Sequence, residues 1–486
     1  MALTVNTNIA SITTQANLNK AGGALATSMQ RLSSGLRINS AKDDAAGLQI
    51  ANRLTSQING LGQAVKNVND GISIAQTAEG AMQASTDILQ KMRTLALSSA
   101  TGSLSPDDRK SNNDEYQALT SELTRISQTT TFGGQKLLDG SYGTKAIQVG
   151  ANANETINLS LENVAANKIG SQQVKTSAIV PDADGLTAGT INVTGNGQTA
   201  AVSYLAGASA KSIAANLNGS IGGLTATAST EAQFKVDTAI TKATPAAPAS
   251  FTLQVGDASV NLIGVMDNAG LADQLKSNAA KLGISVNYDS TKGTLEIKSD
   301  TGENIKLTGT AGSAAIGMSV KNGEGVYNND GATPPVQVFT AAADGADLIA
   351  TGQISLDSSK GYSLSGDGVN ELFGAATVSS EQTTIADTDV TDAAKAQNAL
   401  AVIDKAIGTI DGVRSGLGAT QNRLTTTADN LQNIQKNSTA ARSTVQDVDF
   451  ASETAELTKQ QTLQSASTAI LSQANQLPSA VLKLLQ

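Results

Sequence analysis

The sequence contains no cysteine, no histidine and no tryptophan. Without cysteine there can be no disulfide, thiolate nucleophile or zinc–sulfur centre, and without histidine there can be no Ser-His-Asp triad or zincin motif. Catalysis by Asp, Glu, Lys or Ser remains chemically possible, but no such constellation stands out. We therefore expect no enzyme, no metal site and no cofactor.

Aromatic residues are scarce, at 2% of the 486 residues, and proline occurs only seven times. Five prolines lie in the middle of the chain, whereas Pro106 alone lies in the first 180 residues and Pro478 alone in the last 150. Because proline breaks helices, long helices are expected at both ends and not in the centre. With few rings to bury, the core must be built from Ala, Leu, Ile and Val.

Long apolar runs are also missing, since none approaches the roughly 18 residues of a membrane span. The N-terminal MALTVNTNIASITTQ lacks the regions of a secretory signal peptide. The net charge is −9, yet the first 40 residues carry Lys20, Arg31 and Arg37 and no carboxylate, which suits a segment that meets carboxylates of neighbouring copies. No basic patch interleaves with aromatic residues, so we expect neither membrane insertion nor nucleic-acid binding.

Two apolar patterns occupy the N-terminal part. One is a heptad seam with steps of three and four, which predicts a helix over about 41–99, on the order of 85 Å long. It runs through Ala51, Leu54, Ile58, Leu61, Val65, Val68, Ile72 and Ala75, slips near Glu79, and resumes at Met82, Ser85, Leu89, Met92 and Ala96. The other is a separate stripe at Leu18, Leu25, Met29, Leu32 and Leu36.

The stretch SSGLRINSAKDDAAGLQIA, residues 33–51, could be a catalytic constellation, a phosphate loop or a helix start. Ser40-Ala-Lys-Asp43 has the form of a capping box, which would put Asp43 and Asp44 at the positive end of a helix dipole. We favour the helix start, beginning with Lys42 and the two carboxylates. Ser105-Pro106 predicts a second helix start, with Ser105 as N-cap.

Strand signals follow. Alternating residues at 147–149 and 157–161 predict a β-hairpin. Between about 176 and 390 a weak internal repeat predicts, twice, a hairpin followed by a short helix. The two copies are GTINVTGNGQTAAVSYL with SAKSIAANLNG, and SFTLQVGDASVNLIGV with AGLADQLKSNAAKLG, separated by TKATPAAPAS.

Helical periodicity returns near residue 390. A second seam runs through Leu400, Ile403, Ile407, Ile410, Leu417, Leu424, Ala428 and Leu431, and a final stripe through Leu463, Ser467, Ile470, Ala474, Leu477, Val481 and Leu484. The predicted fold class is α+β: a long coiled-coil-like helical bundle formed by both chain ends, with β-rich variable domains inserted between them. We place terminal helices at 1–40 and 451–486, the bundle at 41–175 and 390–450, and the insert at 176–389, as two modules divided near 241–250.

The two terminal stripes are too mild to hold isolated helices in water. They either dock on a core as ordinary helices or fold only when many copies bury one another's stripes. We favour the second alternative, in which these ends are disordered in the monomer.

The two chain ends read MALTVNTNIASITTQANLNKAGGALATSMQRLSSGLRINSAKDDAAGLQIANRLTSQINGL and ARSTVQDVDFASETAELTKQQTLQSASTAILSQANQLPSAVLKLLQ. These stretches resemble the two ends of bacterial flagellin, and the resemblance covers roughly the first 170 and last 95 residues. It implies a subunit that is exported unfolded and polymerises into the flagellar filament for swimming. The implied partners are further copies of the chain, an export chaperone, and the filament cap and hook-associated proteins.

One segment also resembles the flagellin patch that the animal Toll-like receptor five recognises. The matching residues are Leu89, Gln90, Arg93, Leu95 and Glu115, while Lys91 replaces an arginine and Thr94 a glutamate. Because lysine lacks the bidentate fork of arginine, weaker recognition is expected. Leu89 and Leu95 also fit the seam.

Two alternatives remain. An enzyme domain in the insert, as some flagellins carry, would need His ligands, and Asp182-Ala-Asp184-Gly185 is too short for a calcium loop. A flagellar junction or secretion-tip protein would share the helical ends.

Overall fold

The computed structural model describes residues 7–177, 179–242, 247–309, 313–327, 337–341 and 346–484, with side chains up to residue 476. The chain divides into two compact units. The first comprises Met1–Gln76, Thr144–Ser160 and Leu417–Gln486, and the second comprises Thr77–Gly143 and Leu161–Gly416.

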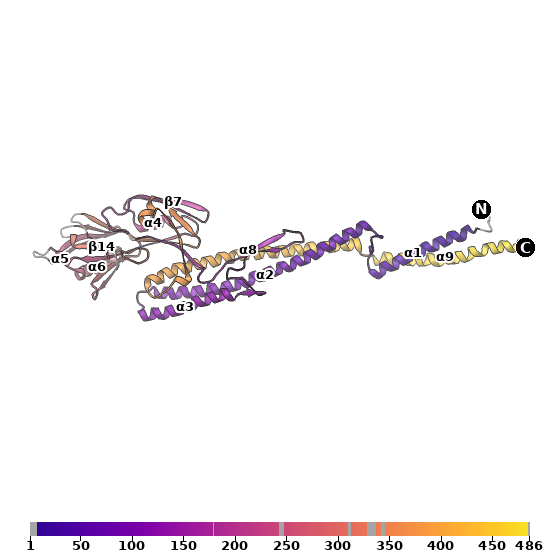
Figure 1. Cartoon of the computed structure of the whole chain (residues 1–486), viewed down its shortest axis with the longest axis horizontal. Coiled ribbons are helices and arrows are strands. Elements are labelled where there is room, and N and C mark those ends of the chain that lie inside the picture. The colour runs from indigo at the N-terminus through magenta and orange to yellow at the C-terminus, as the bar shows by residue number, and fades with distance from the viewer. Residues whose placement is uncertain are drawn as a thin grey trace. The chain divides into compact units, whose positions relative to one another are not determined.

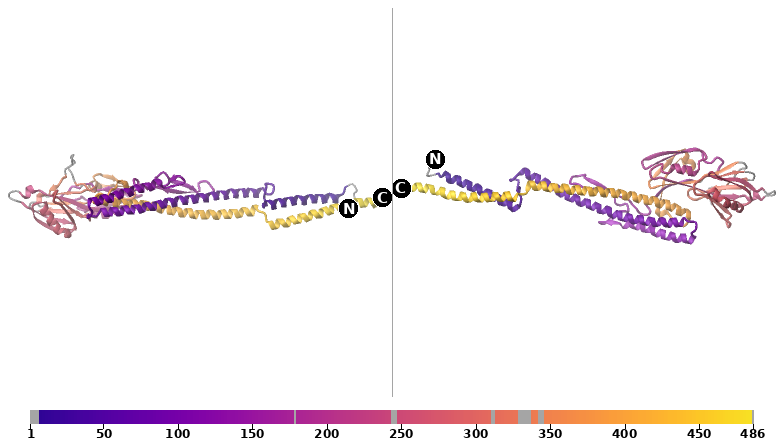
Figure 2. Two further views of the ribbon diagram at one scale, coloured as in Figure 1. Left: turned by 90° about the horizontal axis from the view of Figure 1, so that it is seen from below. Right: turned by 180° about the vertical axis from the view of Figure 1, so that it is seen from behind.

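Long helices from opposite ends of the chain pair in the first unit. α1 (Ile9–Ser34) lies beside α9 (Phe450–Leu484), and the first part of α2 (Ala45–Ser99) lies beside the last part of α8 (Ala393–Gln446), as Figures 1 and 2 show. The breaks between the helices also pair, because Leu36 forms a β-bridge with Asp447 and Arg37 Nη2 donates to the Val445 carbonyl at 2.6 Å. The predicted packing of the two chain ends is thus confirmed.

The start of α2 differs from the prediction. The helix begins at Ala45, and the residue that caps it is Asp44, whose carboxylate accepts a bond from the Gly47 amide at 2.9 Å. Ser40 and Asp43 form a separate turn, in which Asp43 accepts from the Ser40 amide at 2.8 Å and hydroxyl at 3.0 Å. These bonds lower the pKa of Asp43. Ser40 is therefore not the N-cap, although the stretch is a helix start as predicted.

The seam of α2 is more regular than the large apolar residues suggested. From Leu61 to Ser99 one series of buried positions steps by three and four without a break, with Thr86 buried beside it, so the predicted slip near Glu79 is wrong. Small residues occupy positions that the prediction missed. The series runs Leu61, Ala64, Val68, Gly71, Ala75, Ala78, Met82, Ser85, Leu89, Met92, Ala96 and Ser99.

A two-stranded hairpin completes the first unit. β3 (Gly143–Gln148) and β4 (Thr156–Leu161) pair as predicted, and Asn67 Nδ2 of α2 donates to the Gln148 carbonyl at 3.1 Å. Val149 and Ile157 of the hairpin share one apolar cluster with residues of α2 and α8, namely Leu61, Ala64, Val68, Leu424, Ala428 and Leu431.

The second unit begins with the later part of α2 and continues with α3 (Pro106–Thr129), followed by the short strands β1 (Thr131–Phe132) and β2 (Gln135–Lys136). The Ser105 N-cap, the capping box with Asp108 and the proline in the first turn are all confirmed. Tyr116 of α3 is fully buried and shares a 2.6 Å hydrogen bond with the Thr388 hydroxyl. Burial raises the pKa of Tyr116 to about 12.

In the described residues, the insert together with β5, which directly precedes it, forms three antiparallel sheets. One has the order β10-β9-β13-β16, another β19-β18-β6-β7, and the largest β11-β12-β8-β17-β5-β20 with β14 and β15 attached. The strands are β5 (Gly170–Lys175), β6 (Gly189–Gly195), β7 (Gln198–Tyr204), β8 (Thr225–Val236), β9 (Ala249–Val255), β10 (Ala258–Val265), β11 (Ser285–Asp289), β12 (Thr294–Ser299), β13 (Ile305–Gly309), β14 (Ile316–Val320), β15 (Thr340–Ala341), β16 (Asp347–Ala350), β17 (Gln353–Ser358), β18 (Tyr362–Ser365), β19 (Thr377–Ser379) and β20 (Glu381–Thr384).

Short helices cover these sheets: α4 (Ala210–Leu217), α5 (Thr238–Thr241), α6 (Asn268–Leu282) and α7 (Asp367–Phe373). The predicted repeat is confirmed, because β6-β7-α4 and β9-β10-α6 are each a hairpin followed by a helix.

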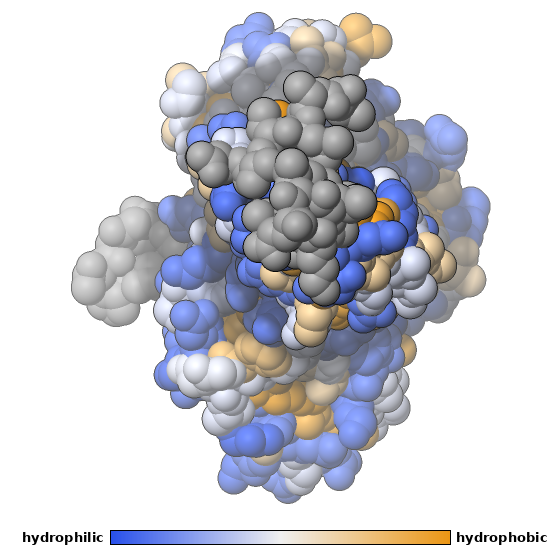
Figure 3. Space-filling view, turned by 90° about the vertical axis from the view of Figure 1, so that its right-hand side faces the viewer, coloured by the Kyte–Doolittle hydropathy of each residue, from blue (hydrophilic) through white to orange (hydrophobic). Residues whose placement is uncertain are grey.

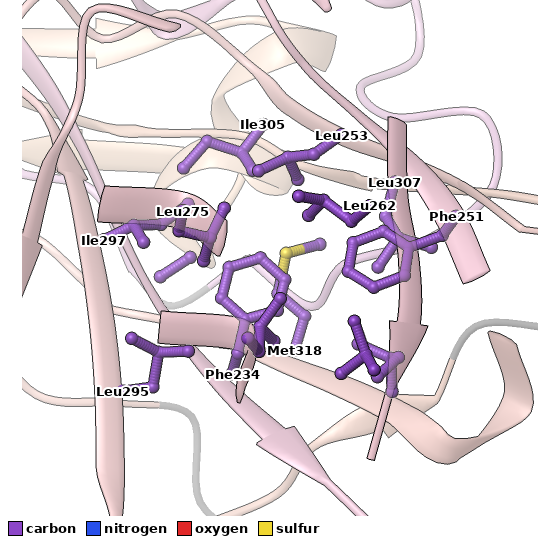
Figure 4. Packing of buried hydrophobic residues seen from close by; sticks show 14 of the residues in the cluster. Phe234, Phe251, Leu253, Leu262, Leu275, Leu295, Ile297, Ile305, Leu307 and Met318 are labelled. Atoms are coloured by element: carbon purple, nitrogen blue, oxygen red, sulfur yellow. The ribbon is translucent and has the colours of Figure 1, made fainter. Parts of the chain in front are cut away.

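Two apolar cores lie in the part of the insert that the structure describes. One gathers around Phe234, Phe251 and Met318 (Figure 4), and the other around Ile191, Leu217 and Leu356. The long strand β8 belongs to both: its residues 225–229 pair with β17, and residues 230–236 pair with β12 and β14. Division of the insert into independent modules near 241–250 stays a prediction.

Candidate functional site

The α1–α9 pair buries little of its own apolar surface. Only Ala21 and Ser28 of α1 and Ala474 of α9 are buried among the side chains that the structure describes in these helices. Six large apolar side chains remain between 45% and 68% exposed, namely Ile9, Ile12 and Met29 of α1 and Phe450, Leu463 and Ile470 of α9. In the view of Figure 3, apolar residues lie exposed between hydrophilic ones. From here on, the apolar stripes are the six exposed residues Ile9, Ile12, Met29, Phe450, Leu463 and Ile470, which coincide only in part with the stripes predicted from the sequence.

Some of the stripe residues predicted from the sequence are half-buried in the structure, and others are exposed. Leu18, Leu25 and Leu32 are half-buried in α1, and Leu36 lies half-buried just after it. Met29, Leu463 and Ile470 are exposed. The side chains of Leu477, Val481 and Leu484 lie outside the part that the structure describes.

Polar contacts hold α1 against α9. Asn8 Nδ2 donates to the Ala474 carbonyl at 2.8 Å, and Ser11 donates to the Asn475 amide oxygen at 2.8 Å. At the other end, Arg31 Nη1 lies 3.7 Å from Glu453. Arg31 thus meets a carboxylate of its own chain, whereas the sequence suggested one from a neighbouring copy. Polar bonds fix the register of this pair while its large apolar side chains stay available.

The predicted bundle seam lies inside the helical packing. Leu61, Val68, Ile403, Ile410 and Leu424 are buried. The others are half-buried and flank the small residues of the seam: Leu54, Ile58, Val65, Ile72, Leu400 and Ile407. These residues stabilise the fold rather than form a surface site.

The receptor-like patch is partly on the surface. Gln90, Lys91, Arg93 and Glu115 are exposed, Leu95 is half-buried, and Leu89 is fully buried in the seam. Arg93 Nε donates to Asp404 Oδ1 of α8 at 2.7 Å, and this bond raises the pKa of the guanidinium. Asp404 could not be predicted as the partner of Arg93 because the two residues lie 311 positions apart.

The described residues show no sign of a metal site or of a membrane-spanning helix. They contain no cluster of three or more potential metal ligands, and no helix among them is long and apolar enough to cross a bilayer. Asp182 Oδ1 accepts bonds from the Asp184 and Gly185 amides at 3.1 and 2.6 Å, so this carboxylate closes a turn.

Comparison with known proteins identifies the family to which this chain belongs. Models of the bacterial flagellin N-terminal and C-terminal helical regions match residues 5–143 and 400–485. A B-type flagellin from Pseudomonas aeruginosa is 50% identical over 499 aligned positions, which cover 100% of both chains. The chain belongs to the bacterial flagellin family. Flagellin B of Vibrio cholerae is 36% identical over 485 positions, again with 100% of both chains covered. A solved structure of FliC from Burkholderia pseudomallei shares 19% identity and a TM-score of 0.30, over 73% of this chain and 99% of that one, and supports no inference here.

Membership of the flagellin family settles several predictions. As a flagellin, the chain is an extracellular structural subunit of the flagellar filament and not an enzyme. The predicted α+β fold class is also confirmed. The alternative of a junction or secretion-tip protein is less well supported, because the relatives that match the whole chain are flagellins.

Proposed function

We propose that this flagellin assembles through the apolar stripes of α1 and α9 and that the resulting filament serves swimming motility. The observation that carries the proposal is the exposure of six large apolar side chains on a helix pair that buries almost none of its own. Large apolar side chains left exposed along both helices of a pair are typical of a surface that neighbouring molecules cover. The ends of the chain would be disordered in the monomer and order as they pack.

The energy of the stripes favours many neighbours over one. Each large apolar side chain gains about 1.5–3 kcal/mol on full burial, so six that are 45–68% exposed in the α1–α9 pair offer roughly 5–9 kcal/mol before the cost of ordering the chain ends. Association of two copies costs about 4–15 kcal/mol in lost translational and rotational freedom. One neighbour therefore gives a marginal complex, whereas several neighbours around each α1–α9 pair give a stable, cooperative polymer.

Export of the chain and contact with the proteins at the two filament ends would use the same helices, α1 and α9. A chain without cysteine has no disulfide that would block passage in an unfolded state. We expect an export chaperone to cover the stripe of α9 before assembly, and the hook-associated and cap proteins to present matching helices at the two filament ends.

Host recognition by Toll-like receptor five is the second part of the proposal. Gln90, Arg93 and Glu115 present polar groups on the surface, while Leu89 supports them from inside the seam. A receptor would then contact the exposed residues and depend on Leu89 only through the shape of the helix.

Exposed stripe residues allow a sharp test of assembly. Leu463→Ser with Ile470→Ser removes apolar side chains that are 45% and 55% exposed in the α1–α9 pair, so helix content should change little. Seeded filament growth should be abolished in this variant. The matched control is Gln461→Ala, at an exposed polar position on the same helix, which should elongate seeds normally. Normal growth of the double variant would refute the proposed role of the stripes.

A further inference from the structure

Four asparagines in this chain are followed directly by glycine: Asn59, Asn196, Asn218 and Asn322. In such a pair the glycine amide nitrogen can attack the side-chain carbon Cγ of asparagine, which closes a five-membered succinimide and releases ammonia. Water then opens the ring to aspartate or isoaspartate. Glycine favours the attack because it has no Cβ in the way and its backbone adopts many conformations.

Three of the four pairs are protected by hydrogen bonds of the glycine amide. Gly60 lies inside α2, where each amide donates to the carbonyl one turn earlier. The Gly219 amide donates to the Leu224 carbonyl at 3.0 Å, and the Gly323 amide donates to the Thr176 carbonyl at 2.9 Å. A nitrogen held in this way cannot reach Cγ until the local structure opens.

The asparagine side chains in two of these pairs are also held. Asn218 Oδ1 accepts from the Ala226 amide at 3.4 Å, and Asn322 Oδ1 accepts from the amides of Glu324 and Val326 at 3.0 and 2.9 Å. Both ends of the reacting pair are therefore fixed in the fold.

The fourth pair, Asn196–Gly197, has a different setting. It forms the two-residue turn between β6 and β7, where Gly195 pairs with Gln198 and both turn residues have positive φ, 52° and 73°. Both residues are exposed, and no atom lies within 4 Å of where a Gly197 Cβ would be. In the described part of the chain the Gly197 amide has no hydrogen-bond partner.

We propose that Asn196 is a site of spontaneous deamidation in the folded protein. Only a two-residue hairpin tip has to open for the Gly197 nitrogen to reach Cγ, and exposed tips open at low free-energy cost. At the other three glycines a hydrogen bond of the fold must break first.

The modification would change the surface of the insert. Lys360 Nζ donates to Asn196 Oδ1 at 3.3 Å, so a new carboxylate at this position gains an ion pair. Isoaspartate instead adds a methylene to the main chain of a turn that needs positive φ at both positions, and this disturbs the β6–β7 register. A filament would thus acquire charge heterogeneity with age.

Mass spectrometry of the full-length protein tests this directly. Trypsin places the four pairs in separate peptides, 54–66, 176–211, 212–235 and 322–360, and deamidation adds about 1 Da. After incubation of the folded protein at mildly alkaline pH, peptide 176–211 should gain this mass at least about ten times faster than the other three, with the change at residue 196. Incubation in denaturant should bring the four rates together.

Two controls separate this proposal from a general tendency of the sequence. Isoaspartate must appear at residue 196, because opening of a succinimide yields it whereas direct hydrolysis does not. The Asn196→Ser variant should keep its far-ultraviolet circular dichroism and lose the mass gain of peptide 176–211. Equal rates for Asn196 and Asn218 in the folded protein, or aspartate without isoaspartate, would overturn the proposal.

Discussion

Replacement of Gly71 and of Gly80 by alanine should change the stability of α2 in opposite directions. Both glycines lie inside this helix, where alanine gains about 1 kcal/mol over glycine because the unfolded chain loses less freedom on folding. A Cβ on Gly80 meets no atom within 4 Å, so Gly80→Ala should stabilise by about 0.5–1 kcal/mol. A Cβ on Gly71 would lie 2.5 Å from Ile147 Cδ1 and 3.4 Å from Leu424 Cδ1.

The contact with Ile147 decides whether Gly71→Ala stabilises or destabilises α2. Leu424 is fully buried and limits how far Ile147 can move, so we expect an overpacking cost of about 1–3 kcal/mol. Set against a helix gain of about 1 kcal/mol, the net effect of Gly71→Ala is a loss of roughly 0–2 kcal/mol. The two variants should therefore differ by about 1–3 kcal/mol.

Native-state hydrogen exchange with mass spectrometry can measure this in the full-length protein, because it reports the opening free energy of individual helix segments. In a Leu424→Ala background Ile147 gains room to move, so the cost of Gly71→Ala should fall by at least about 0.5 kcal/mol. If Gly71→Ala stabilises α2 as much as Gly80→Ala does, the packing of the hairpin against α2 and α8 is wrong.

Three further outcomes are expected. Replacement of residues 180–379 by a short Gly/Ser bridge should leave a protein that still forms filaments, because Gln173 of β5 pairs with Glu381 of β20 and the bridge has little distance to close; a folded deletion variant that never polymerises would contradict this. Asp404→Ala should lower activation of Toll-like receptor five about two- to fivefold by releasing the Arg93 side chain, as expected for an exposed ion pair. The control Asp411→Ala, which frees Arg414 instead, should have no effect, and equal potency of the two variants would count against the patch. The melting temperature of the insert should be constant between about pH 5.5 and 7.5 and fall below about pH 4. The reason is that no histidine titrates, while the pKa of Asp267 is lowered by the Gly270 amide and Lys242, and that of Asp347 by Lys306 and Thr308. A lowered folded pKa gives stability that is present above the unfolded value and lost as pH falls through the folded one, so a thermal transition that shifts near pH 6.5 would contradict this assignment.

Periodicity and capping chemistry predicted much of the helical architecture. Ser105 with Pro106 predicted the start of α3 because the capping groups are neighbours in sequence. The α2 seam was predicted one residue off at several positions, because hydrophobicity draws attention to Val65 and Ile72. Small residues such as Ala64 and Gly71 are buried on this face of α2, and their larger neighbours Val65 and Ile72 are half-buried beside them.

Features that depend on pairing between distant residues could not be predicted. The ion pair of Arg93 with Asp404 depends on the pairing of α2 with α8. The exposure of Leu463 and Ile470 depends on how α9 packs beside α1. Asp44 replaced Ser40 as the cap because Ser40 and Asp43 are already bonded to each other in a turn. From the sequence, Ser40 is the only predicted cap, because the S-x-x-D pattern does not reveal that residues 40–43 close a turn of their own.

The shared strand β8 has a consequence for how such inserts can diversify. Residues 225–229 of β8 belong to one core, and residues 230–236 belong to the other. If recombination exchanged only one core, the incoming segment would have to supply half of β8, and that half would have to continue the remaining half in register. A crossover inside β8 would leave edge residues without ladder partners and apolar side chains such as Phe234 without a core. Viable exchanges should therefore transfer the two cores together, with crossovers outside both.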